Sequence, residues 1–414
     1  MKRPLLLLAA MAAVLLVCAG GALTQSPPQG SSEKPAGDGS TTMSSLAVDD
    51  AQRLTPIVGE VRHAPVPFDG SDGRTHLVYE LAATNFTGGT TTIEKLKVLD
   101  ADTGEVVKAL GAKGVANRLQ PAGLRSTVDA LAPSMAANIF LHVIFEEANQ
   151  VPDRLVHRLV VEAEAAPPDQ RRVTEEVAPT EVDRRDVAVI GPPLKGRNYV
   201  AADSCCDATR HTRAALPING QVWLAQRYAV DYEQLDADSR FFVGEKEKLE
   251  NWKIYGKRAL AVADGTVVKV IDGLPEQVPG IFPENISLEE ADGNAVILDI
   301  GGGNYALYAH FQPGSVRVEE GEQVERGKVL GLVGNSGNSL APHLHFHVMS
   351  SPLALASNGL PYEVGSFALT GQTPGTEAFD EAEDKGTPLE VTPIEPPKAV
   401  TDALPLDQNV VRFE

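Results

Sequence analysis

Residues 342–348 read Pro342-His343-Leu344-His345-Phe346-His347-Val348, so that three histidines alternate with apolar side chains. In a β-strand, residues two apart share a face, and the histidines would form a row with about 6.6 Å between neighbours. Neutral imidazole nitrogen is a favoured zinc ligand, and a catalytic zinc site joins three protein ligands to an open position for water. A polar strand face without metal is the alternative. It is disfavoured because these three come from only nine histidines in the chain.

The region around this strand, from about Leu194 to Leu369, alternates short apolar runs with glycine turns. Five runs are predicted to be strands: 260–263, 266–271, 295–300, 305–310 and 329–333. This pattern is typical of an all-β domain with little helix. We therefore expect an antiparallel sheet here and place the domain at residues 194–370.

This region resembles the lysostaphin-type zinc metallopeptidases, also called the LytM family. Hallmarks of that family are a His-Leu-His strand, an earlier His-x-x-x-Asp element and a further histidine between the two. The resemblance runs from about Gln226 to Val348 and includes the segments 263–267, 293–296, 308–310, 321–327 and 334–339. It implies a LytM-type β-sheet peptidase domain that binds zinc and hydrolyses peptide crosslinks in bacterial peptidoglycan.

The resemblance also assigns roles to four residues of this chain. It implies that Asp231 and His345 bind zinc, and that His310 and His343 form the catalytic pair. In such a site zinc polarises the scissile carbonyl and lowers the pKa of bound water, while a histidine accepts a proton or stabilises the oxyanion.

The sequence departs from the family pattern at the first zinc ligand, four residues before Asp231, where Arg227 stands in place of histidine. A guanidinium has no acceptor lone pair and stays protonated, so it cannot bind a metal ion. At about 4 Å and an effective dielectric near 20, two unit charges interact by about 4 kcal/mol, and a divalent ion would be repelled about twice as strongly. Arg227 therefore either turns away or pairs with Asp231 and abolishes the ordinary zinc site.

Two other histidines are candidate substitutes for the missing ligand. His347 shares a face with His345, at a position where the family commonly has glutamate, and His211 precedes the arginine by sixteen residues. His211 also lies near Cys205 and Cys206, so a separate thiolate site is an alternative. The adjacent cysteines are free thiols, metal ligands or a vicinal disulfide.

The N-terminal half has a different pattern. Short apolar runs recur between turns at residues 76–84, 93–99, 139–145 and 155–161. Alternation in Leu77, Tyr79 and Leu81 indicates strands rather than helix. We expect a sandwich of antiparallel strands at residues 46–165, immunoglobulin-like in general shape.

The N-terminus has the features of an export signal. Lys2 and Arg3 precede an apolar run from Leu5 to Val17, which predicts a signal peptide at residues 1–22. Lipoprotein anchoring through Cys18 is the alternative. The chain is expected to be secreted, periplasmic or held at the cell envelope, with no transmembrane segment once the signal is cleaved.

Three further segments are predicted to be flexible. Residues 23–45 are rich in Pro, Gly, Ser and Thr and predict a disordered tether. Residues 166–193 combine proline with mixed charge and predict an interdomain linker. Residues 371–414 contain ten acidic residues, three basic residues and six prolines, which predicts an acidic disordered tail.

The balance of 36 Lys and Arg against 56 Asp and Glu gives a formal charge of −20. Such a surface repels polyanions, so nucleic acid is not an expected partner. The predicted function is zinc-dependent hydrolysis of peptidoglycan peptides. Because of Arg227, the alternative is a catalytically degenerate domain that binds peptidoglycan or activates a partner cell-wall hydrolase.

Overall fold

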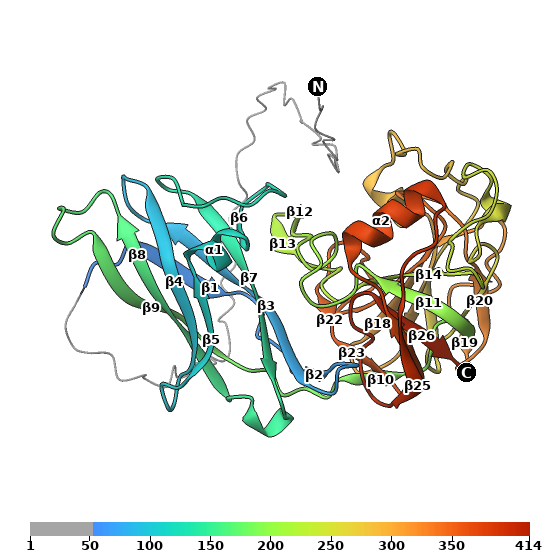
Figure 1. Ribbon diagram of the computed structural model, residues 1–414, viewed down its shortest axis with the longest axis horizontal. Coiled ribbons are helices and arrows are strands. Elements are labelled where there is room, and N and C mark those ends of the chain that lie inside the picture. Colours follow the sequence, from blue (N-terminus) through green and yellow to red (C-terminus); the bar gives the residue numbers. More distant parts are fainter. Residues whose placement is uncertain (1–52) are drawn as a thin grey trace, which may run out of the picture. The chain divides into compact units, whose positions relative to one another are not determined.

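Strands make up nearly all of the regular structure in the computed structural model, which describes residues 53–414 (Figure 1). The helices of this part of the chain are α1 (Ala112–Ala116), α2 (Thr376–Lys385) and the 3-10 turns Ala148–Gln150, Leu249–Asn251 and Leu288–Glu290. The predicted all-β class is therefore confirmed. The predicted signal peptide, the tether and Cys18 lie outside the described residues.

Two antiparallel sheets form the N-terminal part of the described chain. The first has the order β1-β3-β7-β6 with β2 beside β3, and its strands are β1 (Ile57–Val61), β2 (Phe68–Asp69), β3 (Thr75–Asn85), β6 (Leu119–Pro121) and β7 (Ala136–Phe145). The second has the order β5-β4-β8-β9, and its strands are β4 (Thr91–Asp100), β5 (Val106–Gly111), β8 (Arg154–Ala163) and β9 (Arg172–Glu181). Apolar side chains of both sheets pack into one core. We call this part the sandwich; its likeness to immunoglobulin domains stays a prediction.

Strand β3 is buried on both faces. Leu77, Tyr79 and Leu81 point into the core of the sandwich. Because side chains alternate along a strand, His76, Val78 and Glu80 lie on the opposite face. Val78 belongs to the core of the C-terminal part, and Tyr228 of that part donates its hydroxyl to the Val78 carbonyl at 3.3 Å. One strand therefore serves two cores.

An eleven-stranded sheet dominates the C-terminal part. Its strands follow the order β19-β16-β17-β18-β21-β14-β11-β26-β24-β25, with β22 beside β21. Their bounds are β11 (Gly196–Ala202), β14 (Val230–Gln234), β16 (Gly265–Ile271), β17 (Asn294–Asp299), β18 (Tyr305–Phe311), β19 (Gln323–Val324), β21 (Leu344–Met349), β22 (Gly359–Leu360), β24 (Phe367–Gln372), β25 (Thr392–Val400) and β26 (Asn409–Phe413). All pairs in this sheet are antiparallel, as expected.

Smaller strand pairs lie around this sheet. They are β10 (Ala188–Ile190) with β23 (Tyr362–Val364), β12 (Leu216–Ile218) with β13 (Gln221–Trp223), and β15 (Arg258–Leu260) with β20 (Val329–Leu332). The β10-β23 pair is parallel.

The predicted linker at residues 166–193 is wrong. Within it, β9 pairs with β8 along most of its length and completes the second sheet of the sandwich. Further along, β10 pairs with β23 of the C-terminal part. Within β9, Arg172, Glu176, Pro179 and Glu181 occupy exposed positions, so the composition resembled that of a linker although this part of the backbone is paired.

The predicted disordered tail at residues 371–414 is also wrong. β26 lies between β11 and β24 in the large sheet, and buries Val411 and Phe413. Phe379 of α2 packs against Phe241, with 4.8 Å between ring centroids. These few apolar side chains anchor the segment, while most of its acidic residues face solvent.

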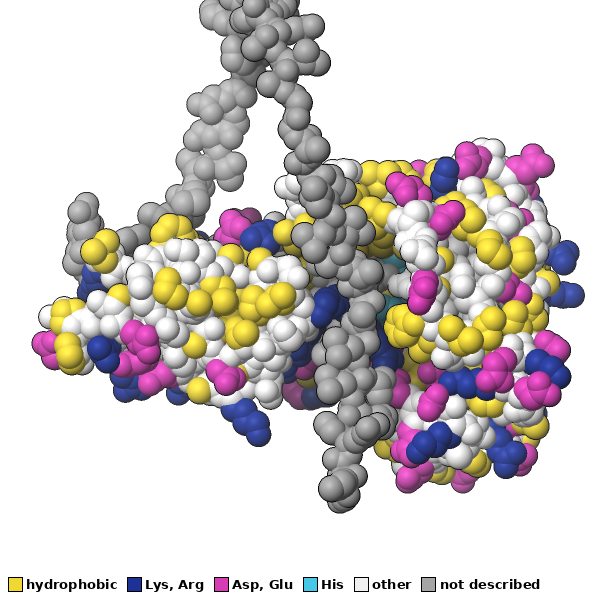
Figure 2. Space-filling view, turned by 90° about the horizontal axis from the view of Figure 1, so that it is seen from above, with side chains coloured by type: hydrophobic (Ala, Val, Ile, Leu, Met, Phe, Trp, Pro, Cys, Tyr) yellow, Lys and Arg dark blue, Asp and Glu magenta, His cyan; other side chains and the backbone are white. Residues whose placement is uncertain are grey.

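The surface of the described residues is mixed in charge. Acidic and basic side chains are scattered over the face shown in Figure 2 rather than gathered in separate areas. None of the helices in residues 53–414 has the length and apolar composition needed to cross a membrane.

His157 shows how the sandwich uses a buried histidine. Its Nδ1–H donates to the Ala178 carbonyl at 3.1 Å, and its Nε2 accepts from the Tyr79 hydroxyl at 2.9 Å. Burial lowers the pKa of His157 to about 4. The ring is therefore neutral in the folded chain at neutral pH.

We predict that acid weakens the sandwich through His157. The unfolded chain takes up this proton near pH 6.5, so the stabilisation is complete above pH 6.5 and is lost as pH falls towards about 4. The full loss is roughly 3 kcal/mol at about 1.4 kcal/mol per pKa unit. Urea denaturation should show that the free energy of unfolding falls more between pH 7.5 and pH 4.5 for the wild type than for His157→Gln. An equal fall in both proteins would contradict the prediction.

Candidate metal centre

The strand register brings Asp231 and His345 together. β14 and β21 pair so that these two residues are direct cross-strand partners. Their side chains share a face, and His345 Nδ1 lies 2.8 Å from Asp231 Oδ1. His343 is two residues earlier on the same face, and its Nε2 lies 3.4 Å from Asp231 Oδ1. Two residues more than 110 positions apart in sequence thus form the centre of the site.

His310 enters the site from the end of β18. Its backbone has φ +63°, a left-handed conformation that is uncommon outside glycine. Backbone hydrogen bonds from His310 N to Asp292 O and from Gly334 N to His310 O hold this conformation. The imidazole lies 4.7 Å from the His343 ring, measured between centroids. Such strained positions persist where surrounding contacts fix them, often at functional sites.

His211 reaches the site from the segment between β11 and β12. Its ring lies 4.9 Å from that of His345, and its Nε2 lies 3.4 Å from Asp231 Oδ2. Ligand atoms of His211, Asp231 and His345 lie within 4.8 Å of one another. A second group with the same spacing is His310, His343 and His345.

Three of these histidines are oriented in the same way. Each donates Nδ1–H to a backbone carbonyl: His211 to Asp203 at 3.0 Å, His310 to Ser336 at 2.7 Å and His343 to Ala341 at 2.8 Å. Since a neutral imidazole carries one proton, Nε2 of each ring keeps its lone pair. Hydrogen bonds of this kind fix the tautomer and the ring orientation of metal-binding histidines.

This arrangement leaves acceptors facing acceptors. The Nε2 lone pairs of His211 and His343 each face an Asp231 oxygen at 3.4 Å, with no proton between them in the neutral tautomers. A cation among these atoms would turn the repulsion into coordination. Nitrogen and carboxylate oxygen are ligands that zinc accepts in catalytic sites. The donor set therefore fits zinc.

The titration of the site agrees with this picture. Burial alone would raise the pKa of Asp231, but the surrounding His211, His343 and His345 rings outweigh it and hold that pKa well below its usual value. Burial lowers the pKa of His310 and of His345, so both rings stay neutral. An ionised Asp231 beside neutral His310 and His345 rings is a state in which these groups bind a metal ion.

His347 lies behind the site. Its Nδ1 is 3.0 Å from His345 Nε2, the ring nitrogen that faces away from Asp231. The structure therefore places His347 as a support for His345 rather than beside Asp231. Of the two candidate substitutes for the missing ligand, only His211 is brought to the carboxylate.

Arg227 turns away from the site and pairs with the sandwich. Its Nε and one terminal nitrogen donate to the two Glu80 oxygens at 2.8 and 2.7 Å. Its other terminal nitrogen donates to the Gly359 carbonyl at 3.2 Å. Both charged side chains are less than 10% exposed. The expected alternative, a pair between Arg227 and Asp231, is not formed.

Sequence patterns did not indicate two parts of this centre. Glu80, the partner of Arg227, lies 147 residues away from it. Glu233 follows Asp231 by two positions and lies against Glu383 of α2. Burial raises the pKa of both carboxyl groups, and the contact with Glu383 raises that of Glu233 further. Only strand pairing and the ordered tail bring these residues together.

Comparison with known proteins identifies the C-terminal part. Residues 252–357 match the model of peptidase family M23. We call the C-terminal part, which contains this segment, the M23 domain. The match contains His310, His343 and His345 but begins after His211 and Asp231. The resemblance to lysostaphin-type peptidases is thereby confirmed. A search of curated proteins found no match.

Several solved M23-type structures are similar to the chain. The catalytic domain of the M23 protein EnpA from Enterococcus faecalis has 19% identity, with 41% of this chain and 92% of that one covered, at a TM-score of 0.24. The lysostaphin catalytic domain from Staphylococcus simulans has 21% identity, with 37% of this chain and 82% of that one covered, at a TM-score of 0.20. A zinc-containing peptidase from Vibrio cholerae has 15% identity, with 68% of this chain and 80% of that one covered, at a TM-score of 0.20. Because these values are low, the M23 assignment rests on residues 252–357.

We predict that Glu80 and Arg227 stabilise the contact between the sandwich and the M23 domain as a unit. Glu80→Leu alone leaves a buried guanidinium without a counter-charge and Arg227→Met alone leaves a buried carboxylate, and each change should cost about 3–5 kcal/mol. The double variant Glu80→Leu with Arg227→Met removes both charges and should recover most of that loss. Chemical denaturation of the four proteins measures the coupling. Additive effects of the two single changes would contradict it.

Proposed function

We propose that this protein is a zinc-dependent endopeptidase of the cell envelope that hydrolyses peptide crosslinks of peptidoglycan. His211, Asp231 and His345 would hold the metal ion. The proposal is carried by one observation: His211 and His343, each with Nδ1–H on a backbone carbonyl, direct Nε2 to within 3.4 Å of the Asp231 carboxylate, which His345 also contacts. Zinc bound there would supply Lewis acidity towards a peptide carbonyl and a water molecule.

His211 takes the place that the family gives to the residue at position 227. Its Nδ1–H is held by the Asp203 carbonyl, so the ring is oriented before any ion arrives. Asp231 and His345 complete a set of two nitrogens and one carboxylate oxygen. Three protein ligands leave room for the substrate.

His310 and His343 form the proposed catalytic pair. Both rings keep Nδ1–H on a backbone carbonyl and direct Nε2 into the site. A neutral Nε2 can accept a proton from the attacking water, and the resulting imidazolium can donate to the leaving amine. Burial lowers the pKa of His310, which keeps this ring ready to accept at neutral pH.

The substrate class comes from the M23 family and from the sequence. Lysostaphin, to which the chain is similar, is described as an antimicrobial peptidase. The apolar run from Leu5 to Val17 supports export to the compartment where peptidoglycan lies. The alternative, a domain that binds peptidoglycan or activates another hydrolase without cutting, was favoured by Arg227. Arg227 does not favour this alternative in the folded chain, because its charge is paired with Glu80.

We predict that the purified protein binds one zinc ion per chain and that His211→Ala weakens this binding by more than about 100-fold. That loss exceeds the 10–100-fold typical of residues that only support a ligand. Zinc content after dialysis and competition with a chelator provide the measurement. His63→Ala, which removes an imidazole outside the cluster, is the matched control and should bind zinc like the wild type. Unchanged zinc binding by His211→Ala would refute the ligand set.

We predict that His343→Ala retains zinc but lowers hydrolysis of purified cell walls by about 10²–10⁴-fold, the range for loss of a general acid–base group. Release of soluble wall fragments, with and without chelator, measures the rate. Activity that survives complete removal of metal would exclude the zinc mechanism. Wall binding without any release by the wild type would instead favour the binding module.

A further inference from the structure

A second group of metal-ligand types lies where the sandwich meets the M23 domain. It consists of His76, His142 and Cys206, whose ligand atoms lie within 4.8 Å of one another. His76 and His142 come from the paired strands β3 and β7, on the face opposite the core of the sandwich. Cys206 comes from the segment after β11. None of the three belongs to the proposed zinc centre.

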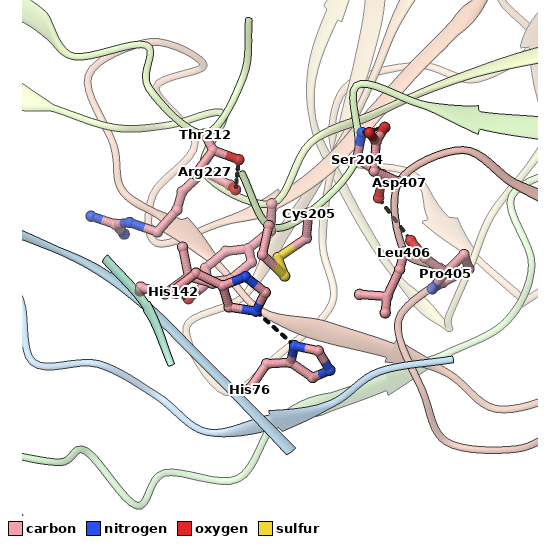
Figure 3. Close-up of a disulfide and its surroundings, with 12 residues drawn as sticks. His76, His142, Ser204, Cys205, Thr212, Arg227, Pro405, Leu406 and Asp407 are labelled. Atoms are coloured by element: carbon pink, nitrogen blue, oxygen red, sulfur yellow. Dashed lines mark hydrogen bonds between the residues drawn. A yellow bond between two sulfur atoms is a disulfide. The ribbon is translucent and has the colours of Figure 1, made fainter. Parts of the chain in front are cut away.

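The two imidazoles already meet through ring nitrogens. His76 Nδ1 lies 2.8 Å from His142 Nε2, as Figure 3 shows beside the disulfide. The far nitrogen of His76, Nε2, lies 3.0 Å from Asp72 Oδ1. Because a carboxylate only accepts, Nε2 of a neutral His76 carries the proton and Nδ1 keeps its lone pair. A carboxylate behind a histidine is the support found at many metal ligands.

The surroundings of His76 are built for this position. The ring is 1% exposed and stacks on Phe68, with 5.5 Å between centroids. A Cβ atom at Gly70 would lie 2.6 Å from His76 Nε2. Any other residue at position 70 would displace the ring, so glycine there allows the imidazole to sit between Asp72 and His142.

Cys206 forms a disulfide with its neighbour Cys205. In this form its sulfur is not a thiolate and is a poor metal ligand. A dithiol reductant would transfer two electrons to the disulfide and become a disulfide itself, while both cysteine sulfurs gain a proton. The Cys206 thiol then releases its proton to solvent when a metal ion binds, as metal-binding thiols do.

We propose that reduction of the Cys205–Cys206 disulfide creates a second metal site, formed by the Cys206 thiolate, His76 Nδ1 and His142 Nε2. In this state His142 moves its proton to Nδ1, and Asp72 keeps the His76 proton on Nε2. One thiolate and two imidazoles suit zinc or a similar borderline-soft cation. The site joins the sandwich to the M23 domain by a metal ion only under reducing conditions.

Cobalt(II) is the probe that separates this site from the proposed zinc centre. A thiolate ligand gives cobalt a sulfur-to-metal charge-transfer absorption in the near ultraviolet, and the zinc centre contains no sulfur. The full protein is reduced with dithiothreitol, freed of reductant by gel filtration without oxygen, and titrated with cobalt(II). We expect the absorption to saturate at one ion per chain after reduction and to be missing from the oxidised protein.

Variants test each member of the site. Cys205→Ser leaves a thiol at position 206 that cannot form the disulfide, so it should show the absorption without reductant. His142→Ala should weaken cobalt binding by more than 100-fold and Asp72→Asn by about 10–100-fold. His63→Ala should match the wild type.

Three results would overturn the proposal. The first is that the thiols of Cys205 and Cys206 are both titratable in the reduced chain while the charge-transfer absorption is missing. The second is an absorption that neither His76→Ala nor His142→Ala reduces. The third is an absorption that persists in Cys206→Ser, because it would make Cys205 the ligand. The proposed zinc centre does not involve the disulfide. Wall hydrolysis by the oxidised protein therefore does not depend on any of these three results.

Discussion

The buried ion pair between Glu80 and Arg227 is the constraint that organises the functional half of this protein. A guanidinium buried to this degree requires a counter-charge. The counter-charge comes from β3 of the sandwich. Because β3 alternates, the residues that fill the sandwich core and those that contact the M23 domain lie on one strand. The sandwich therefore takes part in the electrostatics of the M23 domain.

The segment between β11 and β12 supplies side chains to both proposed metal sites. It contributes His211 to the zinc centre and Cys206 to the site beside β3. Contacts from three directions fix it. Arg210 donates to Asp380 of α2 at 2.6 Å, Arg213 donates to the Asn117 carbonyl of the sandwich at 2.8 Å, and Asp407 N donates to the Cys205 carbonyl at 3.0 Å. The ordered tail is thus part of the support for His211.

The sequence predicted the parts of the site that depend on local pattern. Alternation in residues 343–347 placed His343 and His345 on one strand face, and the resemblance added Asp231 and His310. The sequence pattern did not predict the role of Glu80, because a salt bridge between distant segments produces no periodic pattern in the sequence. The tail was misjudged for a related reason: composition averages 44 residues, whereas three or four buried apolar side chains decide whether β26 joins the sheet. His211 was named because it lies sixteen residues before Arg227 and near the two cysteines, and this position in the sequence does not fix its distance from Asp231.

The position of Arg227 alters the electrostatic argument against a zinc centre. An isolated guanidinium about 4 Å from a divalent ion would repel it by roughly 8 kcal/mol at an effective dielectric near 20. Paired with Glu80, the arginine belongs to a neutral unit whose field falls off faster with distance than that of a single charge. The guanidinium also donates to Gly359 and Glu80, so its protons are directed away from Asp231. Arginine in place of histidine at position 227 therefore removes one nitrogen ligand without adding a net positive charge, and in the proposed zinc centre His211 would supply that nitrogen.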